Sequence, residues 1–96
     1  MAEGEVIQVG KNTKVSVLSQ RLMQRFLKQG WIELEAVGAE AVNQAVKAVA
    51  KARQTLEAEG YSLVIIPKLV EVPLGHGSQT VVHLTVVNMG ESFFGG

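Results

Sequence analysis

Apolar residues in the first third of the chain recur at intervals that favour a short strand followed by a helix. Residues 5–9 read as a short extended run. Over residues 14–29 the spacing changes to steps of three and four, which predicts an amphipathic helix. Its apolar positions are Val15, Leu18, Leu22 and Phe26. Asn12 or Thr13 is expected to cap this helix, because both side chains accept hydrogen bonds from backbone N–H groups.

The next segment, residues 31–37, alternates as a strand does. Every second residue from Ile32 to Ala36 is apolar, whereas Glu33 and Glu35 share the opposite face. Two carboxylates on one face indicate that this face meets water. The sheet is therefore expected to carry helices on one face only.

An alanine-rich stretch, residues 39–59, predicts the second helix, and Gly60 is expected to end it. The small side chains allow this helix to lie close to the sheet. Its expected apolar stripe is Val42, Ala45, Val46, Val49, Ala52 and Leu56.

The last third of the chain predicts strands. Residues 61–66 form an apolar run that Pro67 is expected to stop, and residues 69–74 and 80–89 flank a hairpin tip at 75–79. The order β-α-β-α-β-β predicts a two-layer α/β sandwich, with a mixed four-stranded sheet and two helices on one face. Residues 1–89 are expected to form one domain, followed by a Gly/Phe-rich tail, 90–96.

Composition narrows the possible functions. The chain has no cysteine and no aspartate, and no serine lies in a nucleophile elbow, so no catalytic residue is predicted and an enzyme is not expected. His76 and His83, even if they face each other across a turn, make a weak metal site, so neither a metal nor a cofactor is predicted. The chain lacks a run of about 20 apolar residues and a signal peptide, which favours a cytoplasmic protein without a membrane partner.

The junction between the second strand and the second helix is the strongest candidate for a binding surface. A helix start carries unpaired N–H groups and partial positive charge, which attract anions. Asn43, Gln44 and Lys47 lie near this start, and Gly38 precedes it, either to adopt a positive φ or to admit a partner. Amide and ammonium groups bind phosphates, sugars and base edges. An ordinary polar helix face has the same composition.

A second group of candidates precedes and enters the first helix. Lys11, Asn12 and Lys14 lie in the loop, and Arg21 follows in a basic stripe that is also typical of a solvated helix face. Lysines contact phosphates as mobile point charges, and solvated turn lysines are the alternative. The net charge is zero, with nine Lys and Arg against nine Asp and Glu, which limits a nucleic-acid binder to a local basic surface.

Residues 37–53 closely resemble the bacterial stage V sporulation protein S family, from Val37-Gly38-Ala39 through Ala41-Val42-Asn43-Gln44 to Ala52-Arg53. The predicted order of elements agrees with that family over residues 5–89. The resemblance implies a regulatory role connected with sporulation or developmental timing.

The organisation is also similar, more distantly, to the archaeal Alba proteins. Their Gly-Lys-Lys loop corresponds to residues 10–14, and their second helix start to Gly38, Ala39, Ala45 and Lys47. This similarity implies a homodimer that sets loop lysines on the DNA backbone and hairpins along the minor groove. Here the hairpin, residues 72–82, has no Lys or Arg, so moderate affinity is expected, for DNA or RNA.

These observations predict a small, non-enzymatic nucleic-acid-binding regulatory protein that acts as a homodimer or a higher oligomer. The alternative is a protein-interaction module, in which the exposed sheet face and Phe93-Phe94 of the tail bind another protein chain.

Overall fold

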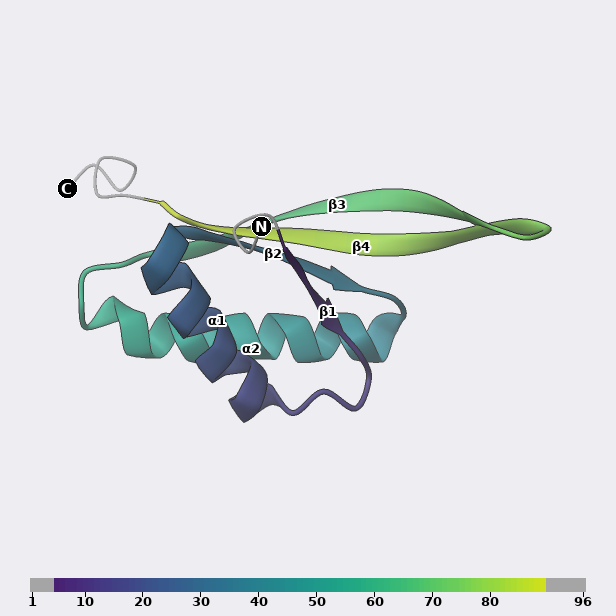
Figure 1. Cartoon of the computed structure of the whole chain (residues 1–96). Helices are drawn as coiled ribbons and strands as arrows, with labels where there is room; N and C mark the ends of the chain where they lie inside the picture. Colours follow the sequence, from purple (N-terminus) through teal and green to yellow (C-terminus); the bar gives the residue numbers. More distant parts are fainter. Residues whose placement is uncertain (1–4, 90–96) are drawn as a thin grey trace.

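A four-stranded sheet backed by two helices makes up residues 5–89, the part of the chain that the computed structural model describes (Figure 1). The elements are β1 (Val6–Val9), α1 (Val15–Gln29), β2 (Trp31–Ala36), α2 (Ala39–Glu57), β3 (Leu63–Leu74) and β4 (Gly77–Asn88). The predicted β-α-β-α-β-β order and two-layer architecture are confirmed. The predicted tail, residues 90–96, lies outside the described residues.

The strands lie in the order β1-β2-β4-β3. β1 and β2 pair in parallel, and β4 runs antiparallel to both of its neighbours, β2 and β3. β3 therefore has the direction of β2, as the crossover through α2 predicts, but it is not the neighbour of β2. The closing hairpin returns β4 into the space between them.

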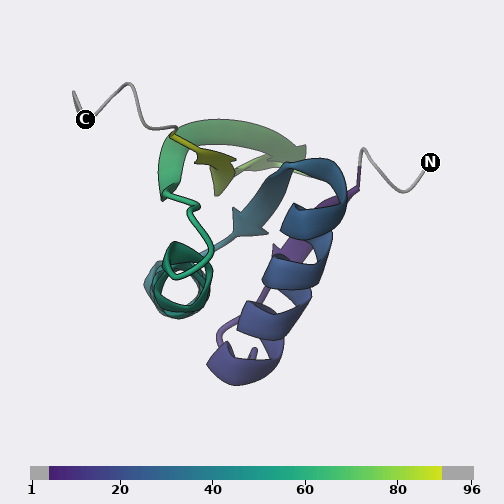
Figure 2. The same cartoon turned by 90° about the vertical axis from the view of Figure 1, so that its left-hand side faces the viewer.

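One face of the sheet is covered by both helices and the other is open (Figures 1 and 2). Ile32, Leu34 and Ala36 of β2 are almost fully buried, whereas the intervening Glu33 and Glu35 are only partly buried. The covered face meets α1 through Leu22 and its neighbours in a single hydrophobic cluster. The one-sided covering expected from the glutamates is confirmed.

The buried side of α2 differs from the predicted stripe at Val46 and at two alanines. Val46 is 44% exposed, whereas Ala41 and Ala48 are buried. The alanines lie on one side of the helix at steps of three and four, and small side chains allow close approach to the sheet and to α1. The rotation that buries this alanine row leaves Val46 outside.

The prediction that Pro67 stops a strand is wrong. β3 runs unbroken from Leu63 to Leu74, with Pro67 opposite Leu84 of β4. β3 is an edge strand, so a residue without an N–H is tolerated there. The turn is also shorter than predicted, because Leu74 pairs with Gly77 and only two residues connect the strands. Gly75 has φ 49°, the positive φ that such tight hairpins require.

The hairpin extends beyond the rest of the sheet (Figure 1). β2 pairs with β4 only from Val82 to Val87. Residues 70–81, here called the arm, are therefore paired only within the hairpin. The arm contributes to the elongated shape, whose principal extents are 50 × 28 × 26 Å. Within residues 5–89, neither helix is long and apolar enough to cross a membrane.

Candidate nucleic-acid interface

The loop between β1 and α1 is closed by its own threonine. The Gly10 N–H donates to Thr13 Oγ1 (2.8 Å), and the Thr13 N–H donates to the Gly10 carbonyl (3.1 Å). The residue at the N-cap of α1 is Lys14, and it makes no side-chain capping hydrogen bond. The prediction that Asn12 or Thr13 caps α1 is thus wrong, because the Thr13 hydroxyl closes the loop. Lys11, Asn12 and Lys14 are exposed.

A side chain from α2 holds this loop in place. Gln44 Nε2 donates to the Thr13 carbonyl across 2.7 Å, joining residues 31 positions apart in the chain. The two segments predicted separately to bind nucleic acid are therefore neighbours. Gln44 itself is partly buried, and one of its amide hydrogens is engaged within the protein rather than available to a partner.

Gly38 owes its identity to backbone conformation. Its φ is 91° and its ψ 156°, a region that residues with a Cβ rarely adopt, and a Cβ placed there meets nothing within 4 Å. Of the two reasons that the sequence left open, the positive φ applies. The Gly38 carbonyl accepts the first hydrogen bond of α2, from Val42 N–H (3.1 Å).

Lys47 follows Gln44 by three residues and therefore lies near it on α2, one turn beyond the contact with the loop. Lys47 and Asn43 are exposed. Glu40 in the first turn is also exposed, and its carboxylate offsets part of the positive potential of the helix start. The surface is thus basic through its lysines more than through the helix itself.

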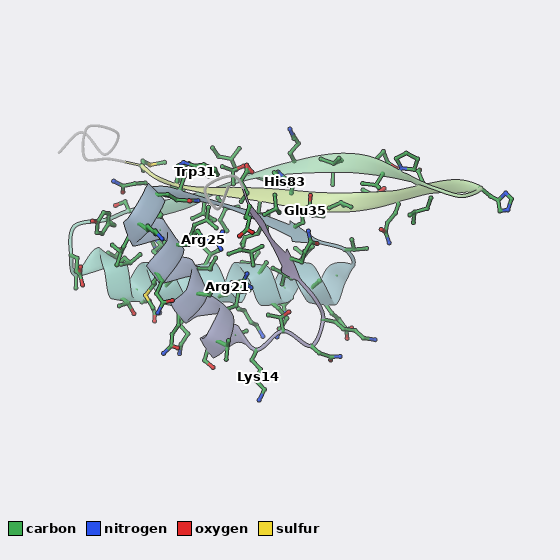
Figure 3. The ribbon with its side chains drawn as sticks, in the orientation of Figure 1. Lys14, Arg21, Arg25, Trp31, Glu35 and His83 are labelled. Carbon is green, nitrogen blue, oxygen red and sulfur yellow. The ribbon has the colours of Figure 1, made fainter. Side chains whose placement is uncertain are left out.

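Arg21 lies apart from this group, two turns along α1 from Lys14 (Figure 3). It is exposed, whereas Arg25, four residues later, is only 17% exposed in its side chain and pairs with Glu5 (3.5 Å). The spacing of seven and four residues places Lys14, Arg21 and Arg25 along one side of α1. Of the predicted residues, Arg21 is the one that lies away from the junction of loop and helix.

The open sheet face carries a row of polar side chains that the sequence did not predict. The Thr85 hydroxyl donates to Glu33 (3.2 Å), His83 Nε2 lies 3.4 Å from Glu33 Oε1, and Gln8 Nε2 donates to Glu35 (2.8 Å). The alternation of β2 placed both glutamates on one face, but only the pairing of β2 with β4 sets Thr85 and His83 beside them.

The two histidines do not face each other. His76 lies in the turn at the tip of the arm, whereas His83 is opposite Lys68 and Glu35 within the sheet. Among the described residues, no group of three His, Cys, Asp or Glu side chains is placed to hold a metal ion.

The arm carries a hydrogen-bonded carboxylate. Thr80 Oγ1 and Ser78 Oγ donate to Glu71 across 2.6 and 2.9 Å. These hydrogen bonds, that of Thr80 more than that of Ser78, hold the pKa of Glu71 below its ordinary value. With Glu71 and no Lys or Arg among residues 70–81, the arm offers a phosphate backbone a carboxylate and no cationic side chain of lysine or arginine, which opposes insertion into a nucleic-acid groove.

Comparison with known proteins agrees with this architecture. The model of the family described as Stage V sporulation protein S (SpoVS) matches residues 5–89. Among solved structures, Alba from Thermoplasma volcanium is similar, with a TM-score of 0.53 and 17% sequence identity, over 86% of this chain and 99% of that chain. This likeness confirms the predicted Alba-like fold.

Proposed function

The chain belongs to the stage V sporulation protein S family, and on that premise we propose that it is a small, non-enzymatic regulatory protein that binds nucleic acid as a homodimer in the cytoplasm. Residues 1–89 form the binding domain. The contacts come from the loop–helix surface, defined as Lys11, Asn12, Lys14, Gly38, Asn43, Gln44 and Lys47, with Arg21 beyond its margin.

The observation that carries this proposal is the hydrogen bond from Gln44 to the Thr13 carbonyl. It brings two exposed loop lysines, Lys11 and Lys14, next to the part of α2 that presents Lys47. Several lysines on one surface bind a polyanion together although the chain as a whole is neutral. Because few phosphates are contacted per chain, the affinity is moderate and depends on both copies of the dimer.

The homodimer is supported by apolar side chains at the arm end of the molecule. Three large apolar residues are exposed beside the base of the arm, on the first half of α2 or on the helix side of β3: Val37, Val46 and Leu69. Leu69 alone is 71% exposed. Exposed apolar residues gathered in one region mark association surfaces. A second copy that covers these side chains removes them from water and doubles the lysines available to one nucleic acid.

Fluorescence anisotropy across a salt series tests nucleic-acid binding, with a labelled duplex and with single-stranded DNA and RNA of the same sequence. The double variant Lys11→Gln/Lys14→Gln is expected to weaken binding and to reduce the slope of log K against log salt by about 0.9 for each duplex phosphate that the lysines no longer neutralise. Lys68→Gln, an exposed lysine on β3, is the matched control. Absence of binding at about 50 mM salt, or an equal weakening in the control, overturns the proposal.

Sedimentation velocity tests the dimer. Leu69→Glu places a charge on the proposed interface and is expected to yield a monomer with an unchanged circular dichroism spectrum. Leu27→Glu makes the same change on α1, at a residue that is 52% exposed and far from the arm in the fold, and is expected to leave the dimer intact. A dimer that survives Leu69→Glu contradicts this interface.

The second candidate function is a protein-interaction module. It is favoured by the open sheet face, which carries the partly buried Trp31 and Val64 and no helix. In that case this face and Phe93-Phe94 bind another protein chain, and the lysines serve solubility. The lysine variants distinguish the two functions, because they leave protein partners bound and release nucleic acid.

A further inference from the structure

An apolar row crosses the open sheet face at the end away from the arm. Trp31 of β2, Val87 of β4 and Val64 of β3 lie opposite one another in register. Each alternates with a residue that contacts the covered core, so all three point to the open face. Val6 of β1 and Ile66 of β3 lie in the next row, on either side of Glu33 and Thr85. These five apolar residues are called the Trp31 patch.

The chemistry of this patch favours an apolar polypeptide segment as its occupant. Glu33 and Glu35 carry negative charge on the same face, which repels a phosphate backbone. Both carboxylates already accept hydrogen bonds within the sheet, Glu33 from Thr85 and Glu35 from Gln8, so neither requires a hydrogen-bond donor from a partner. What the patch lacks is an apolar cover.

The C-terminal segment of the chain begins beside this patch. β4 ends at Asn88, one residue after Val87, and two hydrogen bonds hold this end to Ser62, the residue before β3. The Ser62 N–H donates to Asn88 Oδ1 (2.8 Å), and the Met89 N–H donates to the Ser62 carbonyl (2.7 Å). The chain therefore leaves the sheet at a fixed point next to Trp31 and Val64.

We propose that Phe93 and Phe94 of the same chain dock on the Trp31 patch. Phe93 and Phe94 follow Met89 by four and five positions, and an extended chain covers about 3.3 Å per residue, so these residues reach about 13–17 Å from that point. Neighbouring strands lie about 4.8 Å apart and successive residues on one face about 6.7 Å apart, so the whole patch is within reach. Residues 90–96 lie outside the family match, which ends at residue 89. The cover is thus a feature of this chain beyond its family domain.

Trp31 is the sole tryptophan, so its fluorescence reports directly on the patch. In the full-length chain, Phe93→Ser/Phe94→Ser is expected to shift Trp31 emission to longer wavelength and to increase its quenching by acrylamide. Ser92→Ala in the same segment is the control, with no expected change. Circular dichroism establishes that each variant keeps the fold.

The outcomes separate the possible occupants. An emission shift that is the same at all protein concentrations supports docking within one chain. A shift that appears only in concentrated samples shows that the segment docks on a second copy, and this result overturns the proposal, as does an unchanged spectrum.

Nuclear Overhauser effects between the Phe93 or Phe94 ring and the Trp31 indole, measured on the unmodified chain, provide a test without substitution, and their absence overturns the proposal. Docking of the tail is independent of the loop–helix surface, so Phe93→Ser/Phe94→Ser is expected to leave nucleic-acid affinity and its salt slope unchanged.

Discussion

One partly buried hydrogen bond, 2.7 Å long, joins the β1–α1 loop to α2: Gln44 Nε2 donates to the Thr13 carbonyl. Replacing Gln44 with alanine removes this bond. A hydrogen bond of this kind contributes about 0.5–1.5 kcal/mol net to stability. The higher helix propensity of alanine raises the free energy of unfolding by a few tenths of a kcal/mol and so offsets part of this loss. The expected decrease in the free energy of unfolding is about 1 kcal/mol, which corresponds to a decrease in Tm of about 4–8 °C for a domain of this size.

Urea and thermal unfolding measure this decrease, and Asn43→Ala on the same turn is the matched control. Asn43 is exposed, so its replacement is expected to raise stability by up to about 0.7 kcal/mol through helix propensity alone. In the binding assay, Gln44→Ala is expected to lower affinity without altering the salt slope, because no charge is removed while the loop lysines lose their fixed position. If Gln44→Ala is as stable as Asn43→Ala, the hydrogen bond does not hold the loop and the reasoning fails.

Three further predictions concern the core, the glycine turn and the arm. Leu34→Ala, at a side chain with 0% exposure, is expected to cost about 2–5 kcal/mol in urea unfolding, and a cost below about 1 kcal/mol contradicts the packing. Gly38→Ala forces a Cβ into the backbone at φ 91° and is expected to cost about 1–3 kcal/mol; a neutral effect refutes the positive φ. Because hydrogen bonds from Thr80 and Ser78 lower the pKa of Glu71 from 4.5, the stability that this carboxylate contributes is present above pH 4.5 and is lost as the pH falls through the lowered pKa. Thr80→Val is expected to move the Glu71 midpoint towards 4.5 in an NMR titration, and an unmoved midpoint excludes the hydroxyl as the cause.

The elements were predictable where burial follows a local period. The alternation of β2 identified Ile32 and Leu34 as core, and the three- and four-residue steps of α1 identified Leu22 and Phe26, because in each case the buried face is set by backbone geometry alone. Val46 was misassigned because the rotation of α2 depends on how closely its alanines approach other elements.

The candidate site was predictable only as separate pieces. The loop lysines and the start of α2 are each visible in the sequence, but their contact depends on one amide that spans 31 positions. Gln44, predicted to bind nucleic acid, is the residue that forms this contact. Arg21, predicted with the same group, lies further along α1, since helical spacing aligns it with Arg25 rather than with α2.

Short-range periodicity and one continuous motif, residues 37–53, were enough to establish the kind and order of the elements, the one-sided burial of the sheet and the family. The remaining features depend on tertiary structure. The placement of β4 between β2 and β3, the passage of β3 through Pro67 and the arm all follow from which strands pair. Strand pairing joins segments that are far apart in the sequence, so the local periodicity of one segment does not determine its partner. Strand pairing also gathers the Trp31 patch on the open face of the sheet, and a separate tertiary contact, from Gln44 to Thr13, sets the loop lysines beside α2.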